Sequence, residues 1–471
     1  MTLTQTIQSL DALGQKRLID QGEITPLELT EHYINQIKEL NPKLNAVVHP
    51  MFEDALAKAE NHAKGPGTLN GLPYLIKDLN SVKGHPATNG SKLLKDFIAP
   101  ESDMLVNRFE QAGLNFLGKT NTPEFGFLPT TEPELFGPTK NPWDLDLSPG
   151  GSSGGAAAAV ASGMVPFAHA SDGGGSIRIP ASCCGLFGMK PSRGRMPYAP
   201  YIDQLSVNHA VTKSVRDSAA LLDILKGGTP TELYPTFNNQ EDFLAESQKE
   251  PGKLRIAVAP DWGGQVSIDE DSRQAINQTA KLLEDLGHEV ESTSPNFDFK
   301  TFTEQFIKDW VAGGSVIIKH LGFISGKTPS AENLEAISYD VFKKGTEMTA
   351  LEYEEARVLL HFEAKKILSI FSSYDMILTP VLNSKPVKTG SLNGTDIDSM
   401  YRNMVDYVSF TPIANVTGQP AMSVPLYWTN EGVPIGSHFM GRLGDEATLF
   451  QLAHQLEQAQ PWMEQYLKIK L

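Results

Sequence analysis

Hydrophobic residues along the chain recur either at helical spacing or in short continuous runs. Residues 25–40 begin with Thr, Pro and Glu in a capping-box arrangement, and apolar side chains then recur at Tyr33, Ile34, Ile37 and Leu40. This pattern predicts an amphipathic helix. Start and stop signals of the same kind predict further helices over 52–63, 102–112, 154–163, 216–226, 270–286, 349–371 and 445–459.

Short apolar segments of strand length lie between these helices. Strands that alternate with helices favour a sheet layered by helices. We therefore predict an α/β fold with a mixed, mostly parallel central sheet covered by helices. The predicted strands are Leu72–Ile76, Leu114–Leu117, Val165–Ala168, Leu254–Ala259, Met376–Val381, Ala421–Leu426 and Val433–Met440.

One segment interrupts this alternation. Residues 227–253 are rich in Gly, Pro and polar side chains, which is typical of a subdomain break or of a long surface loop. No repeat of fixed period and no heptad array is present. We predict a single domain over residues 1–471, with that break or loop inside it.

Composition and charge exclude several classes of protein. Lys and Arg total 40 against 56 for Asp and Glu, a net charge of -16, so nucleic acid and anionic membranes are not expected partners. Cys183 and Cys184 are the only cysteines and are adjacent, which excludes a disulfide framework and a zinc site built from them. With neither a long apolar run nor a basic leader, the chain is predicted to be cytoplasmic and to hold no metal.

Two motifs suggest other chemistry but lack the context that it needs. Residues 113–120, GLNFLGKT, have the spacing of a phosphate-binding loop, yet Pro123 disfavours the helix that should follow. The GGSSG segment around Ser152 matches the nucleophile elbow of Ser/His α/β-hydrolases, but prolines interrupt the strand that an elbow requires. His85 and His438 are the only histidines that we would consider as candidates for a role in a site.

A glycine-rich segment carries more chemistry. Gly173, Gly174 and Gly175 directly precede Ser176, and glycines let several backbone N–H groups point at one place. A hydroxyl beside convergent N–H groups is what acyl transfer requires, namely a nucleophile and an oxyanion hole. From this segment alone, a plain turn-forming glycine run is the alternative interpretation.

A serine nucleophile needs a base, and Lys77 is the candidate. It follows the apolar run of the segment GLPYLIKD, where a strand would carry it into the interior. Burial would lower the pKa of its ammonium from about 10.4 toward 7 or 8, which suits a general base. Pairing with Asp78, or extension to the surface, would instead make Lys77 an ordinary lysine.

Taken together, these segments resemble the amidase signature family. The resemblance rests on GLPYLIKD around Lys77, GKTNTPEFG at 118–126, SPGGSSGG at 148–155 and SDGGGSIRIPASCCGLFGMKPSRG at 171–194, and it continues in FTPIANVTGQPAMSVP nearer the C-terminus. It implies one large amidase-signature fold with its core at about residues 65–225. The SDGGGS form is most similar to bacterial cyclic-amide hydrolases of the 6-aminohexanoate cyclic dimer type.

In this family the catalytic group is a Ser, cis-Ser, Lys triad. The resemblance places the nucleophile at Ser176, the bridging serine at Ser152, after a cis Gly151–Ser152 bond, and the base at Lys77. The N–H groups of the glycine segment and of Ser176 would form the oxyanion hole. The resemblance implies a small-molecule amide substrate, no metal or organic cofactor, and a homodimer.

Other residues of the motif are expected to support the triad. Ser153, Asp172 and Arg178 would lie behind it, with Asp172 hydrogen-bonding the glycine segment and Arg178 clamping a carboxylate. Cys183 and Cys184 follow in an apolar setting and are expected to be inert buried thiols.

The substrate pocket is harder to place from sequence. We expect Phe125 and Phe127 at one wall and part of 305–320 at another. Many family members carry Thr or Ile at the position of Gly173. Its bare backbone would therefore admit a bulky or secondary amide.

These observations predict an amidohydrolase that cleaves small neutral amides, including secondary or cyclic ones, with carbamates and activated esters as side substrates. Two alternatives stay open. One is the glutaminase (A) subunit of a tRNA-dependent amidotransferase, although the segment GRMPYAPYID at 194–203 differs from what such a protein would carry. The other is a Ser/His α/β-hydrolase that uses Ser152.

Overall fold

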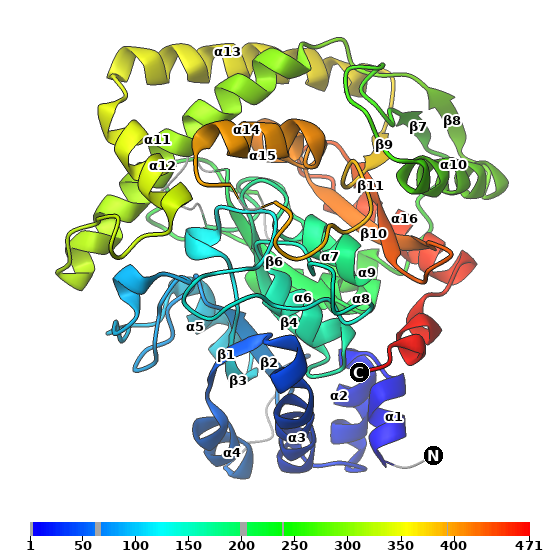
Figure 1. The fold of residues 1–471 in the computed structure, drawn as a ribbon. Coiled ribbons are helices and arrows are strands. Elements are labelled where there is room, and N and C mark those ends of the chain that lie inside the picture. The colour runs from blue at the N-terminus through cyan, green and yellow to red at the C-terminus, as the bar shows by residue number, and fades with distance from the viewer. Residues whose placement is uncertain (1–2, 62–66, 198–204, 238–239, 393) are drawn as a thin grey trace.

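One mixed β-sheet of eleven strands crosses the computed structural model, which describes residues 3–61, 67–197, 205–237, 240–392 and 394–471 (Figure 1). The strand order is β1-β3-β2-β4-β6-β5-β10-β11-β9-β7-β8. The strands are β1 (Val47–Pro50), β2 (Pro73–Lys77), β3 (Asn115–Thr120), β4 (Phe167–Asp172), β5 (Phe187–Lys190), β6 (Val207–Thr212), β7 (Arg255–Val258), β8 (Glu289–Ser292), β9 (Met376–Pro380), β10 (Ala421–Trp428) and β11 (Pro434–Met440).

Parallel and antiparallel pairs occupy different parts of this sheet. β2 pairs in parallel with β3 and β4, and β7 pairs in parallel with β8 and β9. The strands between these two groups pair antiparallel. The pairing of β5 with β10, in register at Met189 and Met422, joins the N-terminal strands to the C-terminal ones. The predicted α/β fold with a mixed central sheet is confirmed.

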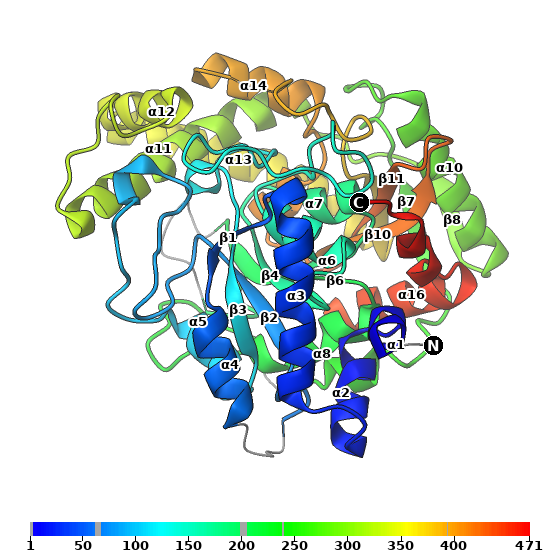
Figure 2. The same ribbon diagram turned by 60° about the horizontal axis from the view of Figure 1, so that its bottom comes forward.

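Helices cover the sheet, as expected (Figures 1 and 2). The helices and strands predicted from the sequence are all present, with ends that differ by a few residues. The helices are α1 (Leu3–Ser9), α2 (Ala12–Gln21), α3 (Pro26–Leu44), α4 (Phe52–Glu60), α5 (Met104–Gln111), α6 (Gly154–Ala161), α7 (Arg178–Cys184), α8 (Val215–Leu225), α9 (Phe243–Glu246), α10 (Glu270–Asp285), α11 (Phe299–Ser325), α12 (Ala336–Glu347), α13 (Ala350–Leu368), α14 (Ile397–Asp406), α15 (Pro412–Thr417) and α16 (Glu446–Ala459).

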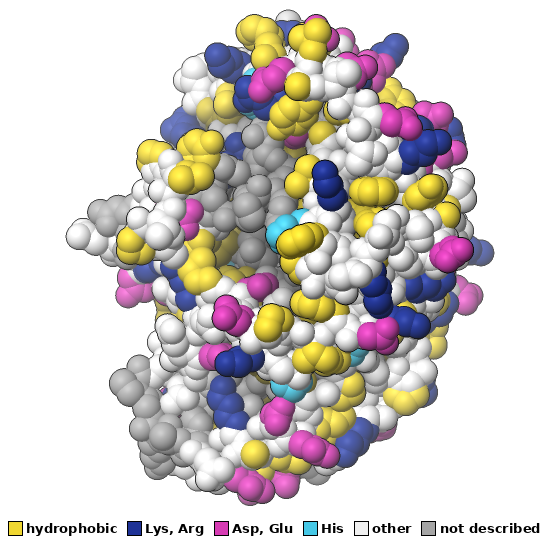
Figure 3. Space-filling model, turned by 90° about the vertical axis from the view of Figure 1, so that its left-hand side faces the viewer, with side chains coloured by type: hydrophobic (Ala, Val, Ile, Leu, Met, Phe, Trp, Pro, Cys, Tyr) yellow, Lys and Arg dark blue, Asp and Glu magenta, His cyan; other side chains and the backbone are white. Residues whose placement is uncertain are grey.

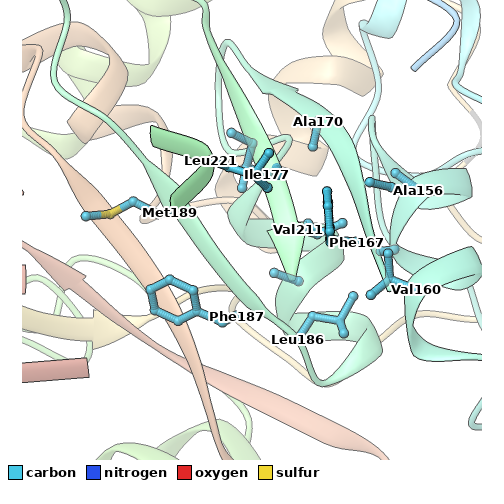
Figure 4. Close-up of a cluster of buried hydrophobic side chains, with 14 of the residues drawn as sticks. Ala156, Val160, Phe167, Ala170, Ile177, Leu186, Phe187, Met189, Val211 and Leu221 are labelled. Atoms are coloured by element: carbon cyan, nitrogen blue, oxygen red, sulfur yellow. The ribbon is translucent and has the colours of Figure 1, made fainter. Parts of the chain in front are cut away.

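Small and aromatic side chains fill the centre of the protein around β4, β5 and β6 (Figure 4). Helix α6, with the sequence GGAAAAVA, is buried over its whole length, because its small side chains let it approach its neighbours closely. Phe167 of β4 and Phe187 of β5 are fully buried in the same cluster. This packing fixes α6, which follows Ser152, and α7, which follows Ser176.

A second apolar cluster involves helices α11 to α15, which gather at the top of Figure 1. Rings stack along α11 from Phe302 to Phe306 and on to Trp310, with centroids 6.4 and 5.7 Å apart. This row reaches the glycine segment, because a Cβ added at Gly173 would lie 3.3 Å from the Trp310 ring. The helical layer therefore covers the region where the candidate residues meet.

Figure 3 shows one face of the molecule, on which charged side chains of both signs are mixed with small groups of hydrophobic ones. Within the described ranges, no helix is long and apolar enough to cross a membrane. The segment 227–253 connects α8 to β7, and its described residues include the short helix α9.

Candidate active site

Strand β2 delivers Lys77 to the interior. All five residues of this strand are buried, and Lys77 is its last. Its Nζ lies 2.7 Å from Ser152 Oγ and 3.1 Å from Ser171 Oγ, within hydrogen-bonding distance of both. Burial lowers the pKa of Lys77 to about 7, and the charge of Asp172 opposes this shift only in part. Much of the Lys77 population is therefore neutral near pH 7.

The alternative partner of Lys77, Asp78, is already occupied. The Asp78 carboxylate forms a fully buried ion pair with Lys119 and accepts a hydrogen bond from Thr88. Lys119 is the lysine of the phosphate-loop-like segment GLNFLGKT, and its Nζ also donates to Pro86 O at 2.7 Å. In this protein that lysine joins a loop to β3, and Lys77 is left to the serines.

Ser152 stands immediately before α6 and follows a cis peptide bond, Gly151–Ser152. Within the part of the chain that the structure describes, no histidine hydrogen-bonds its hydroxyl. His438 is buried with Nε2 2.9 Å from Arg178 Nη1 and Nδ1 2.9 Å from Thr379 Oγ1, so both ring nitrogens are occupied elsewhere. His85 forms an ion pair with Asp54, 3.0 Å away.

Ser176 lines a pocket at the start of α7. Gly174 and Gly126 line the same pocket, and a Cβ added at Gly126 would lie 3.2 Å from Ser152 Oγ. The two serines therefore flank the same floor. Among the described residues, the Ser176 hydroxyl has no hydrogen-bond partner, so the hydrogen bonds run from Lys77 to Ser152 and stop there.

Asp172 holds the glycine segment in place. Its Oδ1 accepts the Gly175 N–H at 2.7 Å, and its Oδ2 accepts the Ile177 N–H at 3.2 Å. The expectation that Gly175 supplies an oxyanion donor is therefore wrong, because its N–H is directed at a carboxylate. No acceptor among the described residues takes the N–H of Gly173, Gly174 or Ser176, which leaves these three groups for a ligand.

The carboxylate that Arg178 clamps is Asp172. Both side chains are buried, and Arg178 Nε and Nη2 donate to the two carboxylate oxygens at 2.9 and 2.8 Å. The guanidinium holds the pKa of Asp172 below its usual range, although burial by itself would raise it. Arg178 is thus not free to bind a substrate carboxylate.

Two serines brace the base from behind. The Ser153 hydroxyl lies 3.3 Å from both the N–H and the carbonyl of Ser171. Ser171 in turn places its own hydroxyl beside Lys77. Sequence analysis missed Ser171, and its signal was its position in the SDGGGS motif.

Two further residues that sequence analysis missed come from the C-terminal part of the chain. Thr411 Oγ1 donates to Gly174 O at 2.7 Å, and Asn415 Nδ2 donates to both Asp172 O and Asp172 Oδ1 at 2.9 Å. Their signal was two polar side chains in the otherwise mostly apolar FTPIAN segment. The loop that precedes Ser176 is therefore held from two distant regions.

The walls of the pocket are apolar. Phe127 lines it, whereas Phe125 packs behind Phe127 with ring centroids 5.6 Å apart. Helix α11 contributes Phe306, Ile307 and Trp310, within the range 305–320 expected to form a wall. The other described lining residues are Leu128, Pro129, Ile179, Met400, Asn403, Met404, Val408 and Pro412, and none of the lining residues is charged.

The remaining nucleophilic groups are sealed in the core. Cys183 and Cys184 are free and buried, and burial raises the pKa of the Cys183 thiol to about 12. Over the described ranges, no group of three or more His, Cys, Asp or Glu side chains is placed to hold a metal ion.

This fold and this site define a class of enzyme. The family model for amidases matches residues 28–450, so the chain belongs to the amidase family, the amidase signature enzymes, and is an amide-cleaving hydrolase. Its similarity extends to a 6-aminohexanoate-cyclic-dimer hydrolase of Pseudomonas sp. (strain NK87), which is 35% identical over 96% of this chain and 95% of that protein.

Solved structures agree with this assignment. A 6-aminohexanoate cyclic dimer hydrolase complexed with substrate superposes with a TM-score of 0.91 and 32% identity, over 97% of this chain and 98% of that one. The glutaminase component of a glutamyl-tRNA(Gln) amidotransferase from Thermotoga maritima superposes with a TM-score of 0.75 and 29% identity, over 93% of this chain and 92% of that one.

Proposed function

We propose that the chain hydrolyses small uncharged amides, secondary and cyclic amides among them, through an acyl-enzyme on Ser176. The observation that carries this proposal is the 2.7 Å hydrogen bond between Lys77 Nζ and Ser152 Oγ, beside the pocket that Ser176 lines. A neutral lysine, a bridging serine and a serine with an unoccupied hydroxyl are the parts that a serine nucleophile needs.

The reaction follows from the roles of these groups. Neutral Lys77 takes a proton from Ser152 while Ser152 takes one from Ser176, and Ser176 Oγ attacks the amide carbon. The free N–H groups of Gly174 and Ser176, with that of Gly173, stabilise the oxyanion. The proton returns through Ser152 to the amine nitrogen as the C–N bond breaks, and water then hydrolyses the acyl ester.

The pocket supports an uncharged substrate. Its described lining is apolar apart from Ser176 and Asn403, so it offers no ionic partner to a charged group. The cyclic-amide substrate named for the similar hydrolases supports secondary amides inside a ring. Carbamates and activated esters pass through the same tetrahedral oxyanion and are expected as side substrates.

Both alternatives are less well supported. A glutaminase must recognise the ammonium and the carboxylate of its amino-acid substrate, and the described lining of the pocket carries no charged group for either. The segment that argued against a glutaminase, 194–203, lies outside the described residues from 198 onward. A Ser/His hydrolase would need a histidine beside Ser152, where the structure has Lys77.

The setting of the reaction follows the sequence predictions. The two cysteines are free thiols, which supports action in the reducing cytoplasm, and the triad supplies acid and base without a cofactor. A homodimer stays a prediction.

Amine release tests the proposal. The panel contains a primary amide, an anilide, a cyclic diamide and an aryl carbamate, each with wild type and Ser176→Ala. Turnover of at least one compound by wild type, reduced about a thousandfold or more in Ser176→Ala, is expected. Activity that persists in Ser176→Ala would assign the nucleophile to Ser152, and silence of wild type on every compound would overturn the proposal.

A further inference from the structure

The peptide between Gly174 and Gly175 is held at both of its ends. Its carbonyl, on Gly174, accepts from Thr411 Oγ1 at 2.7 Å, and its N–H, on Gly175, donates to Asp172 Oδ1 at 2.7 Å. The carbonyl and the N–H of a trans peptide point in opposite directions, so these two bonds fix its rotation. The next carbonyl, on Gly175, accepts from the N–H of Ile179 at 2.7 Å.

This fixed peptide separates the free donors. The Gly174 N–H lies on one side of it and the Ser176 N–H on the other, and both residues line the pocket. Only glycine fits between them, because Gly175 has φ +133 and an added Cβ would lie 2.2 Å from Thr411 Oγ1. The Thr411 side chain therefore packs directly against the loop whose carbonyl it binds.

We infer that the Thr411 hydroxyl is a positioning residue for the oxyanion hole, an inference that rests on the proposed function. Without it, the Gly174 carbonyl loses its only side-chain donor in the described structure, and the peptide is free to rotate. The neighbouring N–H groups then turn away from the developing oxyanion. The backbone of Thr411 has a separate task, because its carbonyl accepts from Arg178 Nη1 at 2.8 Å, and substitution of the side chain leaves that bond in place.

The test compares Thr411→Val, which keeps the shape and removes the hydroxyl, with Thr411→Ser, which keeps the hydroxyl. Thr417→Val is the matched control, because Thr417 Oγ1 donates to Ile413 O at 2.8 Å within the same helix and does not reach the glycine segment. We expect kcat of Thr411→Val to fall about 10- to 100-fold with KM changed less than about threefold, since an oxyanion donor acts in the transition state. Thr411→Ser and Thr417→Val should stay within about threefold of wild type.

A second measurement separates positioning from damage to the fold. A boronic acid that forms a tetrahedral adduct with Ser176 should bind Thr411→Val weaker by the same factor as kcat/KM falls, whereas a carboxylic acid product should bind as in wild type. Equal kcat in Thr411→Val and wild type would overturn the inference, as would equal losses for both ligands. The proposed function fails separately, by full activity in Ser176→Ala.

A different part of the molecule carries a second inference. Helix α13 exposes four large apolar side chains on one face, with exposed fractions of 68% for Leu351, 44% for Val358, 44% for Leu359 and 57% for Phe362. Their spacing of seven, eight and eleven residues from the first places them along a single stripe. A continuous apolar stripe of this kind is typical of a helix that packs against a partner.

The charges beside this stripe select the partner. Glu355 and Lys365 are exposed along it, and neither has an ion-pair partner among the described residues, whereas their neighbours Glu354 and Lys366 are paired within the helix. If two copies of α13 lie antiparallel about their midpoint, Val358 meets the second copy's Phe362. In the same register Glu355 meets the second copy's Lys365.

The geometry thus points to α13 as a self-complementary face that joins two copies of this chain. Sedimentation velocity between about 1 and 50 µM should show a wild-type dimer, a monomer for Phe362→Glu and a weakened dimer for Glu355→Lys. Adding Lys365→Glu to Glu355→Lys should restore the dimer. Leu233→Glu is the matched control, because Leu233 is 90% exposed on a distant segment, and it should leave the dimer intact. A monomeric wild type, or a Phe362→Glu variant that sediments like wild type, would overturn this inference.

Discussion

Lys77 makes activity depend on pH in a definite direction. Burial lowers the pKa of this lysine to about 7, and only its neutral form acts as a base. We expect kcat/KM on an uncharged amide to rise about tenfold per unit below pH 7 and to level off above it. Steady-state rates between pH 5 and 9 measure this, and a flat profile between pH 5 and 8 would contradict the role of Lys77.

The same pKa sets a stability control. The charged form of Lys77 is disfavoured in the folded protein, so the unfolded chain binds more protons between pH 7 and 10.5, and the stability contribution of this residue rises with pH over that window. Lys77→Met removes the cost of burying the ammonium. It should therefore be inactive and yet unfold no earlier than wild type at pH 6, which shows that lost activity is not lost folding.

Gly173 is the residue where substrate size is decided. A Cβ at this position would lie 3.3 Å from Trp310, so a branched side chain would press on the pocket wall. Gly173→Thr should lower kcat/KM for a secondary amide at least tenfold more than for a primary amide. Parallel assays of an anilide and a primary amide test this, and an unchanged ratio of the two rates would contradict it.

Among the elements, α14 determines one pocket wall. This helix turns Met400 and Met404 to the pocket, and its N-terminus is tied to α12 because the Ile397 N–H donates to Asp340 Oδ2 at 2.9 Å. Met404→Ala should open space for a bulkier amine and lower its KM about threefold or more, with kcat for a primary amide little changed. Kinetics on a series of anilides of growing size measure this, and a uniform loss for every substrate would indicate collapse of the wall instead.

Sequence patterns located the elements that carry Lys77, Ser152 and Ser176, because each follows or precedes a strongly apolar segment. They did not locate α11, whose interior contains a Gly-Gly pair that is typical of a helix end. The structure shows why glycine stands there. A Cβ added at Gly314 would lie 3.0 Å from Val341 and 3.1 Å from Phe127, so tertiary packing determines this residue.

The support of the glycine segment was equally beyond sequence patterns. Thr411 and Asn415 lie more than 200 positions from the groups that they bind, and only the pairing of β5 with β10 brings the two regions together. The misassignment of Gly175 has the same origin. A run of glycines indicates freedom of the backbone, whereas the direction of each N–H depends on Asp172.

At the scale of the whole molecule, the chain itself supplies acid, base and oxyanion donors. The described residues contain no group of three or more metal-binding side chains, and Cys183 and Cys184 are sealed in the core. We expect dialysis against a chelator followed by gel filtration to leave kcat within about 20% of its starting value, in keeping with a triad that needs no Lewis acid. A loss restored by added zinc or magnesium would contradict this.

The support of Asp172 by Asn415 also has a consequence for the order in which the enzyme is made. Synthesis proceeds from the N-terminus at about 5–20 residues per second, so Ser176 leaves the ribosome about 10–50 s before Asn415. During that interval the nascent chain carries Lys77, Ser152 and Ser176, but nothing yet holds the Gly174 carbonyl or the Asp172 backbone from the far side. A half-made chain, or one cut short by premature termination, therefore carries all three reactive side chains and remains a harmless hydrolase until its last third has been translated.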